Sequence, residues 1–250
     1  MDDDQLLEVL HDAVTAIAAA LEGLDDWGLA GTRPDQYRSD LVADAAALPV
    51  LLEAGLGVLS EESGLDGADR PILAVLDPVD GSTNASQGLP WFGTSLCAVD
   101  GEGPRVAVVA NQASGVRFEA VRGGGARRAG QPLQASGCES LERAIVALSG
   151  YPARHLGWRQ FRALGAAALD LCAVAEGSLD AYVDCSSSGQ GPWDYLGGAL
   201  VCREAGAVVA DAQGRELVAL EHPDRRAPVA AGTQALLSSL VRARASLPVP

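Results

Sequence analysis

Carboxylates beside predicted turns are the side chains of this sequence best placed to do chemistry. Asp77 and Asp80 lie in the segment LDPVDGST, directly after the apolar run 71–76. Pro78 has no backbone N–H, so it should end a strand formed by that run. Both carboxylates, with the carbonyl of Val79 between them, then emerge at one strand end, within reach of a common ion. Oxygen donors of this kind suit a hard divalent cation such as Mg²⁺.

The next residues resemble the start of a helix that could bind phosphate. Gly81, Ser82, Thr83 and Asn84 follow the second carboxylate directly. The backbone N–H groups at a helix start are free to bind an anion, and small side chains leave them accessible. A metal site and an anion cradle would thus lie side by side, as phosphoryl transfer requires.

Four further acidic residues could join them. Glu61 and Glu62 follow a short apolar run at 57–59, whereas Asp194 in GPWDYLGGAL and Asp40 in YRSDLVAD lie at predicted helix starts. Each has a simpler interpretation when it is taken alone. An acid at a helix start commonly caps the helix, an adjacent Glu pair is commonly solvated, and DPVDG is good turn chemistry.

Apolar spacing predicts the elements that must position these acids. In the first half we expect two helices, a buried strand, an antiparallel meander, and a further turn and strand, at 5–22, 40–54, 71–76, 92–99, 105–111, 115–121 and 123–134. In the second half we expect strands at 144–148, 179–183, 207–210 and 228–231 and helices at 164–176, 194–205 and 233–245. The pattern indicates two halves, 1–138 and 139–250, in one compact unit of α+β and α/β character.

Composition excludes several classes of function. The 250 residues include 48% hydrophobic ones and carry a formal net charge of −15, with Arg as the only basic residue besides three His. An acidic surface disfavours nucleic acids and anionic membranes. No apolar run reaches the ~18 residues that a membrane helix needs. The five cysteines form no CxxC pair and there is no signal peptide, so we expect reduced thiols in a cytoplasmic protein.

Taken together, these motifs resemble the inositol monophosphatase family, whose signatures look like DP(I/V)DGTTNF and WDxAAGxxxxxEAGG. The matching segments occur in family order along nearly the whole chain, at 61–63, 77–84, 162–168, 180–182, 193–198 and 204–207. The resemblance implies a five-layered αβαβα sandwich of the inositol monophosphatase and fructose-1,6-bisphosphatase type. It also implies a homodimer that hydrolyses a small phosphorylated metabolite.

The resemblance further implies two or three Mg²⁺ ions per subunit. The first ion would be held by Glu61, Asp77 and the carbonyl of Val79. The second would be held by Asp77, Asp80 and Asp194, and a third, weaker ion would use Glu61 again.

The same resemblance assigns the reacting groups. Asp40 and Ser82 would orient and deprotonate the attacking water, with Glu61 as the third catalytic residue, and the N–H groups of Gly81 and Ser82 would hold the phosphate. Substrate contacts would come from Asp80, Gly165, Ala166, Ala167 and Asp184.

The chain departs from the family pattern near the expected substrate pocket. The segment 185–192 is longer than in typical members and 149–158 is shorter, while Ser82 replaces the more usual Thr and 197–198 is Gly-Gly. The most direct expectation is hydrolysis of inositol 1-phosphate to inositol and phosphate.

Other functions remain open at this point. The same chemistry could act on histidinol phosphate, fructose 1,6-bisphosphate or a 3′-phosphoadenosine nucleotide, and Arg127, Arg128 and Arg162 could bind a second phosphate. A non-catalytic protein-binding module is a further alternative.

Overall fold

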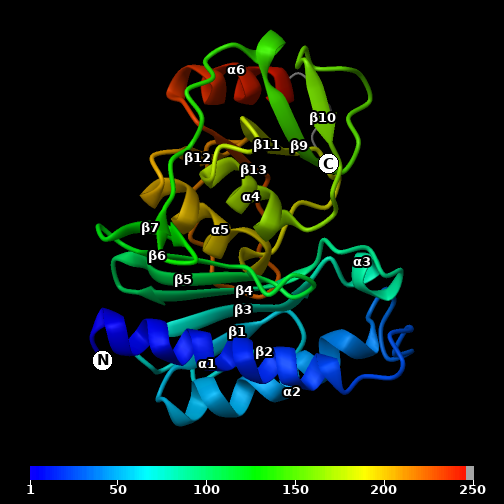
Figure 1. The fold of residues 1–250 in the computed structure, drawn as a ribbon, viewed down its shortest axis with the longest axis vertical. Helices are drawn as coiled ribbons and strands as arrows, with labels where there is room; N and C mark the ends of the chain where they lie inside the picture. The colour runs from blue at the N-terminus through cyan, green and yellow to red at the C-terminus, as the bar shows by residue number, and fades with distance from the viewer. Residues whose placement is uncertain (246–250) are drawn as a thin grey trace.

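The computed structural model describes residues 1–245 as five stacked layers of helices and sheets (Figure 1). Two helices cover an eight-stranded sheet, two more helices separate it from a five-stranded sheet, and one helix covers the far side. In chain order these helices are α1 (Asp3–Glu22), α2 (Arg38–Glu53), α4 (Ala167–Ala175), α5 (Pro192–Glu204) and α6 (Gln234–Ala245). The expected αβαβα sandwich is confirmed. Residues 246–250 of the predicted second half lie outside the described residues.

The larger sheet has the strand order β2-β1-β3-β4-β5-β6-β7-β8. Its strands are β1 (Gly57–Ser60), β2 (Gly64–Asp66), β3 (Leu73–Asp80), β4 (Gly93–Asp100), β5 (Gly103–Asn111), β6 (Arg117–Val121), β7 (Gly125–Arg128) and β8 (Gln131–Pro132). Strands β3 to β8 pair antiparallel in sequence order, which confirms the predicted meander. Only β1 and β3 pair in parallel, so both run toward the same edge of the sheet.

One expectation about β3 was wrong. The strand does not end at Pro78 but continues to Asp80, with a shift of register against β4 between Asp77 and Asp80. The missing N–H of Pro78 is accommodated by this irregularity, since bulges are the sites where a strand tolerates proline. Thr94 on β4 donates to the Pro78 carbonyl at 2.8 Å. The irregularity therefore re-aims the carboxylates without ending the strand.

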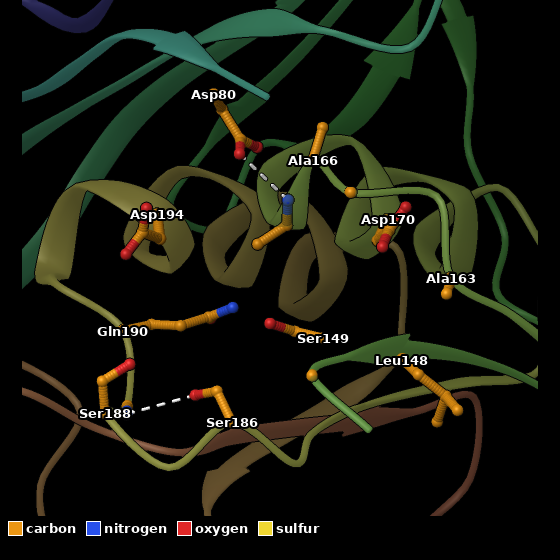
Figure 2. A pocket seen from close by; sticks show the side chains of 14 residues that line it. Asp80, Leu148, Ser149, Ala163, Ala166, Asp170, Ser186, Ser188, Gln190 and Asp194 are labelled. Atoms are coloured by element: carbon orange, nitrogen blue, oxygen red, sulfur yellow. Dashed lines mark hydrogen bonds between the residues drawn. The ribbon is translucent and has the colours of Figure 1, made fainter. Parts of the chain in front are cut away.

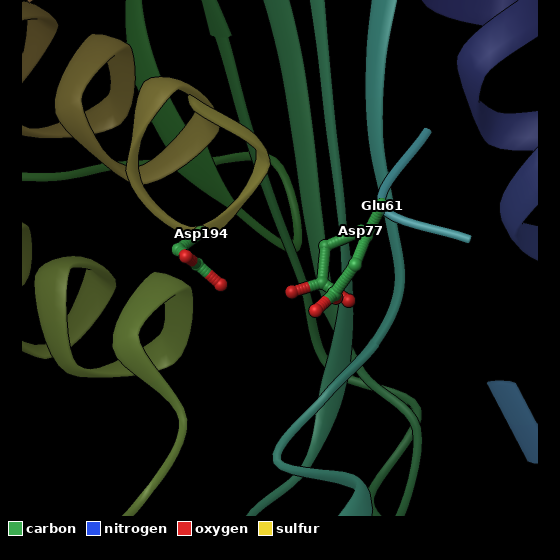
Figure 3. A group of neighbouring side chains, drawn as sticks. All are labelled: Glu61, Asp77 and Asp194. Carbon is green, nitrogen blue, oxygen red and sulfur yellow. The ribbon is translucent and has the colours of Figure 1, made fainter. Parts of the chain in front are cut away.

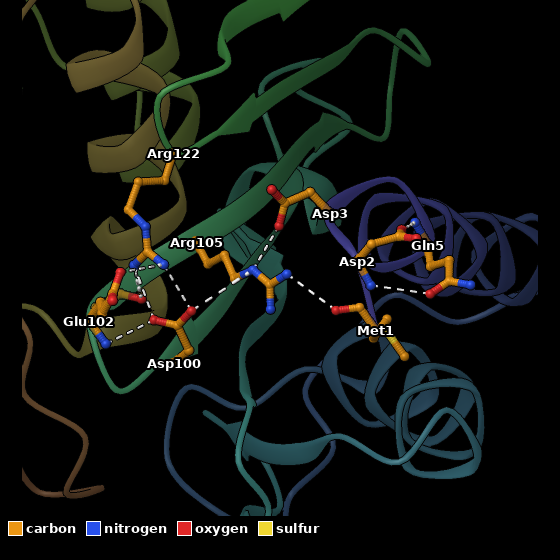
Figure 4. Close-up of polar contacts among 9 residues, drawn as sticks. Met1, Asp2, Asp3, Gln5, Asp100, Glu102, Arg105 and Arg122 are labelled. Atoms are coloured by element: carbon orange, nitrogen blue, oxygen red, sulfur yellow. Dashed lines mark hydrogen bonds and ion pairs between the residues drawn. The ribbon is translucent and has the colours of Figure 1, made fainter.

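Helix α1 begins with a capping box that is anchored to the sheet. The Asp2 side chain accepts from the N–H of Gln5 at 2.9 Å, and the Gln5 side chain accepts from the N–H of Asp2 at 3.1 Å. Asp3 accepts from Nε of Arg105 at 2.7 Å, which ties the helix start to β5 (Figure 4). The apolar face of α1 packs into a core with α2 and the near face of the sheet.

The middle helices are largely buried, because sheets lie both above and below them (Figure 1). Every residue of α4 is buried, and the core around it is built largely from Ala, Val and Leu. Gly198 of α5 lies so close to Leu171 that a Cβ atom would approach the Leu171 Cβ to 2.6 Å. The Gly-Gly pair thus permits close contact between α4 and α5.

The smaller sheet has the order β10-β9-β11-β13-β12. Its strands are β9 (Ile145–Ser149), β10 (Gln160–Arg162), β11 (Ala181–Asp184), β12 (Val208–Asp211) and β13 (Pro228–Ala231). The five predicted elements at 144–148, 179–183, 207–210, 228–231 and 233–245 are confirmed. Strands β2 and β10 and the 3₁₀ turn η1 (Leu141–Arg143) were not predicted.

Two expectations about cellular context can be compared with the described residues. Among residues 1–245 no helix is both long and apolar enough to cross a membrane. All five cysteines are free thiols, and three of them, Cys97, Cys172 and Cys202, are buried. These three thiols therefore act as small core residues.

Candidate active site

Three carboxylates converge at the edge of the larger sheet. Ligand oxygens of Glu61, Asp77 and Asp194 all lie within 4.8 Å of one another. Figure 3 shows Glu61 and Asp77 together, with Asp194 facing them from α5. Two of the three positions follow from strand register. Strand β1 pairs in parallel with β3, and Ser60 is opposite Leu76. The residue that follows each of these two, Glu61 and Asp77, is a carboxylate. The third comes from the first turn of α5.

Asp77 carries the observation most informative about a metal. Its side chain is 1% exposed, and its Oδ1 has no hydrogen-bond partner among the described residues. A buried carboxylate oxygen without a partner is destabilising unless a cation or proton satisfies it. Several carboxylate oxygens in this arrangement are the ligand set that Mg²⁺ prefers. The residues therefore fit a divalent metal ion.

The electrostatics of the group favour neutralisation. Burial, together with the charges of Asp194 and Glu62, raises the pKa of Glu61 to about 8. Burial and the charge of Asp80 raise the pKa of Asp194 to about 7, and burial with the charge of Glu61 raises that of Asp77 well above its usual range. Like charges in a water-poor site disfavour one another's ionisation. A bound cation would reverse this effect and keep the carboxylates ionised.

Two of the site acids also cap helices, as the simpler interpretation proposed. Asp194 accepts from the N–H of Gly191 at 2.7 Å, and Asp40 accepts from the N–H of Tyr37 at 2.9 Å. Pro192 at the first position of α5 suits a helix start. Capping leaves lone pairs on each carboxylate, so it orients these side chains without using them up.

Asp80 lies beside the cluster but faces another element. Its two carboxylate oxygens accept from the N–H groups of Ala167 at 3.1 Å and Ala168 at 2.7 Å, at the start of α4. It is 7% exposed, and burial raises its pKa to about 8 in spite of these hydrogen bonds. Asp80 is not one of the three residues whose ligand atoms converge within 4.8 Å. Its predicted role as a metal ligand stays a prediction.

The predicted helix start after Asp80 is present as α3 (Ser82–Ser86), with Gly81 as its N-cap. Gly81 has φ +85°, and a Cβ there would meet the Gly165 carbonyl at 3.0 Å and the Ala166 Cβ at 3.1 Å. Asn84 fixes the turn by donating to the carbonyls of Trp91 and Leu164, both at 2.7 Å. The close approach therefore requires glycine and holds the turn against the segment before α4.

Asp40 and Ser82 share a hollow of about 350 Å³ with Glu61. Burial raises the pKa of Asp40 to about 6, while hydrogen bonds from Tyr37, Ser39 and Ser82 act in the opposite direction. Glu62 points to a different neighbour, since it pairs with Arg33 and Gln36. Of the two adjacent glutamates, Glu61 therefore lies in the carboxylate cluster, whereas Glu62 is paired with its neighbours in the wall of the hollow.

A second cavity, of about 370 Å³, opens on the other side of Asp80 and Asp194 (Figure 2). Gly165, Ala166 and Ala167 line it, as their predicted role in substrate contact requires. Asp170 and Gln190 are among the polar residues of its wall that the sequence interpretation missed. Asp170 accepts from Nε1 of Trp91 at 2.9 Å, and Gln190 is 7% exposed with an Oε1 that has no partner among the described residues.

Asp184 and Val79 are less accessible than the other predicted site residues. Asp184 is fully buried, accepts from the N–H of Ser186 at 2.9 Å and is absent from the cavity wall. Val79 is buried within the irregular part of β3. Their predicted roles, in substrate contact and through a backbone carbonyl, stay predictions.

Comparisons with known proteins identify the family to which this fold belongs. Residues 52–247 match the inositol monophosphatase family, so this chain belongs to that family. The family is one of phosphatases that act on phosphate monoesters. The family is metal-dependent, typically with Mg²⁺.

Individual relatives are similar over different lengths. Nus factor SuhB of Escherichia coli K12 is 35% identical over 173 residues, an alignment that spans 63% of each protein. The fructose-1,6-bisphosphatase/inositol-1-monophosphatase of Archaeoglobus fulgidus is 30% identical over 227 residues, 87% of this chain and 88% of the relative. The solved inositol monophosphatase of Anabaena superposes with a TM-score of 0.81 at 26% identity, covering 98% of this chain and 97% of that one.

Proposed function

We propose that this protein hydrolyses inositol 1-phosphate to inositol and phosphate, in a reaction that depends on Mg²⁺. The observation that carries the proposal is the convergence of Glu61, Asp77 and Asp194 within 4.8 Å, next to the glycine turn that begins α3. The family supplies the reaction class, and the relative from Archaeoglobus has inositol-1-monophosphatase in its name.

Two or three ions per subunit would occupy the cluster. Glu61, Asp77 and the Val79 carbonyl would hold the first, and Asp77, Asp80 and Asp194 the second. A third, weaker ion would use Glu61. Bound Mg²⁺ supplies a water of lowered pKa and neutralises charge on the phosphate.

The chain's own groups would position the reactants. The N–H groups of Gly81 and Ser82, at the start of α3, would donate to the phosphate oxygens. Asp40, with a pKa of about 6, is ionised at neutral pH and can take a proton from the attacking water, while the Ser82 hydroxyl orients it. Asp40 and Ser82 line the same hollow as Glu61, so all three would meet the water on one side of the phosphate.

The cavity lined by Asp170 and Gln190 would hold the alcohol part of the substrate. Its wall contains Gly165, Ala166 and Ala167 together with serines of the 185–192 segment. Such a wall offers backbone and hydroxyl groups that suit a polyol. Histidinol phosphate, fructose 1,6-bisphosphate and a 3′-phosphoadenosine nucleotide are the alternative substrates. A cytoplasmic homodimer remains our expectation for the assembly.

Phosphate release from a panel of these four esters, at a fixed Mg²⁺ concentration, tests the proposal. We expect the highest kcat/KM for inositol 1-phosphate. A higher value for another ester would retain the chemistry and reassign the substrate. No release from any ester by the folded protein would contradict the proposed activity and favour the binding-module alternative.

A further inference from the structure

A pocket lined by arginines adjoins the substrate cavity. It encloses about 340 Å³, and its lining residues include Arg215, Arg225, Arg226, Arg244 and the 186–189 segment. The chain as a whole carries a net charge of −15, with 18 basic residues. A concentration of four of them around one pocket therefore contrasts with the overall charge and points to an anionic ligand.

Only one of these arginines is neutralised by a carboxylate among residues 1–245. Arg215 forms two hydrogen bonds with Asp211, at 2.8 and 2.9 Å. Arg225 donates instead to the carbonyls of His222 at 2.9 Å and Asp224 at 2.8 Å. Arg226 donates from Nε to the Glu216 carbonyl at 2.7 Å. Carbonyl partners fix a guanidinium in place but leave its full charge available to a ligand.

Arg244 strengthens this inference because it is buried. Its side chain is 4% exposed, and Nε donates to the Asp184 carbonyl at 2.8 Å. It makes no ion pair with any carboxylate of the described residues. The Asp184 carboxyl is close enough for its charge to interact with Arg244, but it forms no ion pair with the guanidinium. The buried charge is therefore only partly compensated, and an anion bound in the adjoining pocket would stabilise it further.

The pocket and the substrate cavity share a wall. Ser186, Ser188 and Gly189 line both of them. The wall is held in place, since Gln190 and Arg226 exchange backbone hydrogen bonds of 2.7 and 2.9 Å. Gly189 has φ +70°, and a Cβ there would meet the Arg226 carbonyl at 3.0 Å. The segment that is long for the family thus forms a fixed partition rather than a loose loop.

The arginines suggested by the sequence for a second phosphate lie elsewhere. Arg128 pairs with Glu176 at 2.8 Å and lies over the Phe118 ring, while Arg162 bonds locally to Phe161 and Gln160. Neither lines the cavity next to Asp80.

We propose that the arginine pocket binds a tetrahedral oxyanion of the phosphate or sulfate type. The anion is either a free ion or the second phosphate of a substrate whose first phosphate lies at α3. The second of these sources rests on the proposed function, whereas the pocket itself does not.

Sulfate is the probe for the pocket, measured by calorimetry on the metal-free protein. We expect the wild type to bind sulfate and Arg226→Met to bind it about tenfold more weakly, the effect of one charge-assisted hydrogen bond. Arg226→Lys, which keeps the charge, should lie between them. Arg127→Met removes one exposed positive charge from β7 and should bind as the wild type does. Arg225→Met provides a second test if Arg226→Met does not fold.

Equal sulfate affinity in the wild type, Arg226→Met and Arg225→Met would overturn the proposal. A wild type that binds no sulfate would overturn it as well. Sulfate binding that depends on Arg226, in a protein that hydrolyses no ester, would support the pocket and contradict the proposed function.

Kinetics then distinguish the two sources of the anion. The ratio of kcat/KM for fructose 1,6-bisphosphate to that for inositol 1-phosphate is compared between the wild type, Arg226→Met and Arg127→Met. A ratio that falls about tenfold only in Arg226→Met would assign the pocket to a substrate phosphate. Weaker sulfate binding with an unaltered ratio would assign it to a free anion.

Discussion

The acidic cluster and the arginine pocket each have a residue next to Trp193, and the two regions are opposite in charge and in organisation. Trp193 precedes Asp194 of the cluster, and the guanidinium of Arg225 lies 5.1 Å from the centre of its ring. In the cluster, buried carboxylates repel one another and their pKa values rise. In the pocket, three of the four guanidinium groups are anchored by backbone carbonyls and have no carboxylate partner in residues 1–245. The charge of each region is therefore only partly compensated by its own neighbours, and a ligand of opposite charge from solution can complete the compensation.

The largest effect is expected from replacing Asp77, a residue of the acidic cluster. Replacing it by Asn removes a proposed metal ligand while it keeps the size of the side chain. Turnover should then fall by at least about 1,000-fold, because a metal ion contributes several kcal/mol to transition-state stabilisation. In chelator the variant should be at least as stable to heat as the wild type, since a repelled, unpartnered carboxylate is gone. Phosphate-release kinetics and thermal unfolding measure the two effects.

Asp66→Asn, on exposed β2, is the matched control and should behave as the wild type. Turnover of Asp77→Asn within tenfold of the wild-type rate would show that the cluster is not the catalytic metal site.

A smaller loss is expected when Ser82 loses its hydroxyl. Ser82→Ala keeps the backbone N–H that would bind phosphate but removes the group that would orient the water, so kcat should fall about 100-fold, the lower range for general acid–base contributions. Ser86→Ala in the same short helix is the control and should retain full activity. A higher KM at an unchanged kcat would instead indicate that Ser82 acts in substrate binding alone.

Metal binding should also depend on pH in a defined direction. The pKa values of Glu61 and Asp194 are raised to about 8 and about 7, so both carboxyls are largely protonated at pH 6 without metal. When folding raises the pKa of a carboxyl, the metal-free protein loses stability as the pH rises from the pKa in the unfolded chain through the pKa in the folded protein. Protons and Mg²⁺ compete for the same oxygens, so added Mg²⁺ should stabilise the protein more at pH 8 than at pH 6.

Thermal unfolding with and without Mg²⁺ measures this effect. A free Mg²⁺ concentration 100 times the dissociation constant corresponds to about 2.7 kcal/mol of added stability. An equal stabilisation at both pH values would contradict metal binding by these carboxyls.

The smallest effect is expected at Asp170, which tests the wall of the substrate cavity. Burial raises its pKa to about 8, so the wild type should lose stability as pH rises toward 8 while the Asn variant should not. Between pH 6 and 9 the difference should grow by roughly 3 kcal/mol, about two units at about 1.4 kcal/mol each. Asn can still accept from Trp91, so the fold should persist. Parallel pH profiles for the two proteins would show that Asp170 is not held neutral by burial.

Local patterns predicted most of the fold and most of the cluster. The helix starts at Asp2 and Asp194 and the glycine turn at Gly81 are short-range features, in which the residue types themselves satisfy backbone groups. The convergence of Glu61 and Asp77 follows from two short apolar runs that both end in acids, once the runs are taken as neighbouring strands.

The remaining features depend on contacts between distant segments. Pro78 was expected to end its strand, but pairing with β4 carries the strand past it. Gln190 and Arg226 are joined by an isolated bridge, and Arg244 reaches Asp184 from the last helix. Neither pairing has a periodic signal in the sequence, so the arginine pocket and the partition beside it could be found only in the structure.

The central claim is that the converging carboxylates form a metal site on which phosphate release depends. The most direct test measures release from inositol 1-phosphate by the wild type, first with all divalent metal removed by chelator and then with Mg²⁺ restored. We expect no measurable release without metal and full recovery when Mg²⁺ is added. Equal rates in chelator and in Mg²⁺ would contradict this claim.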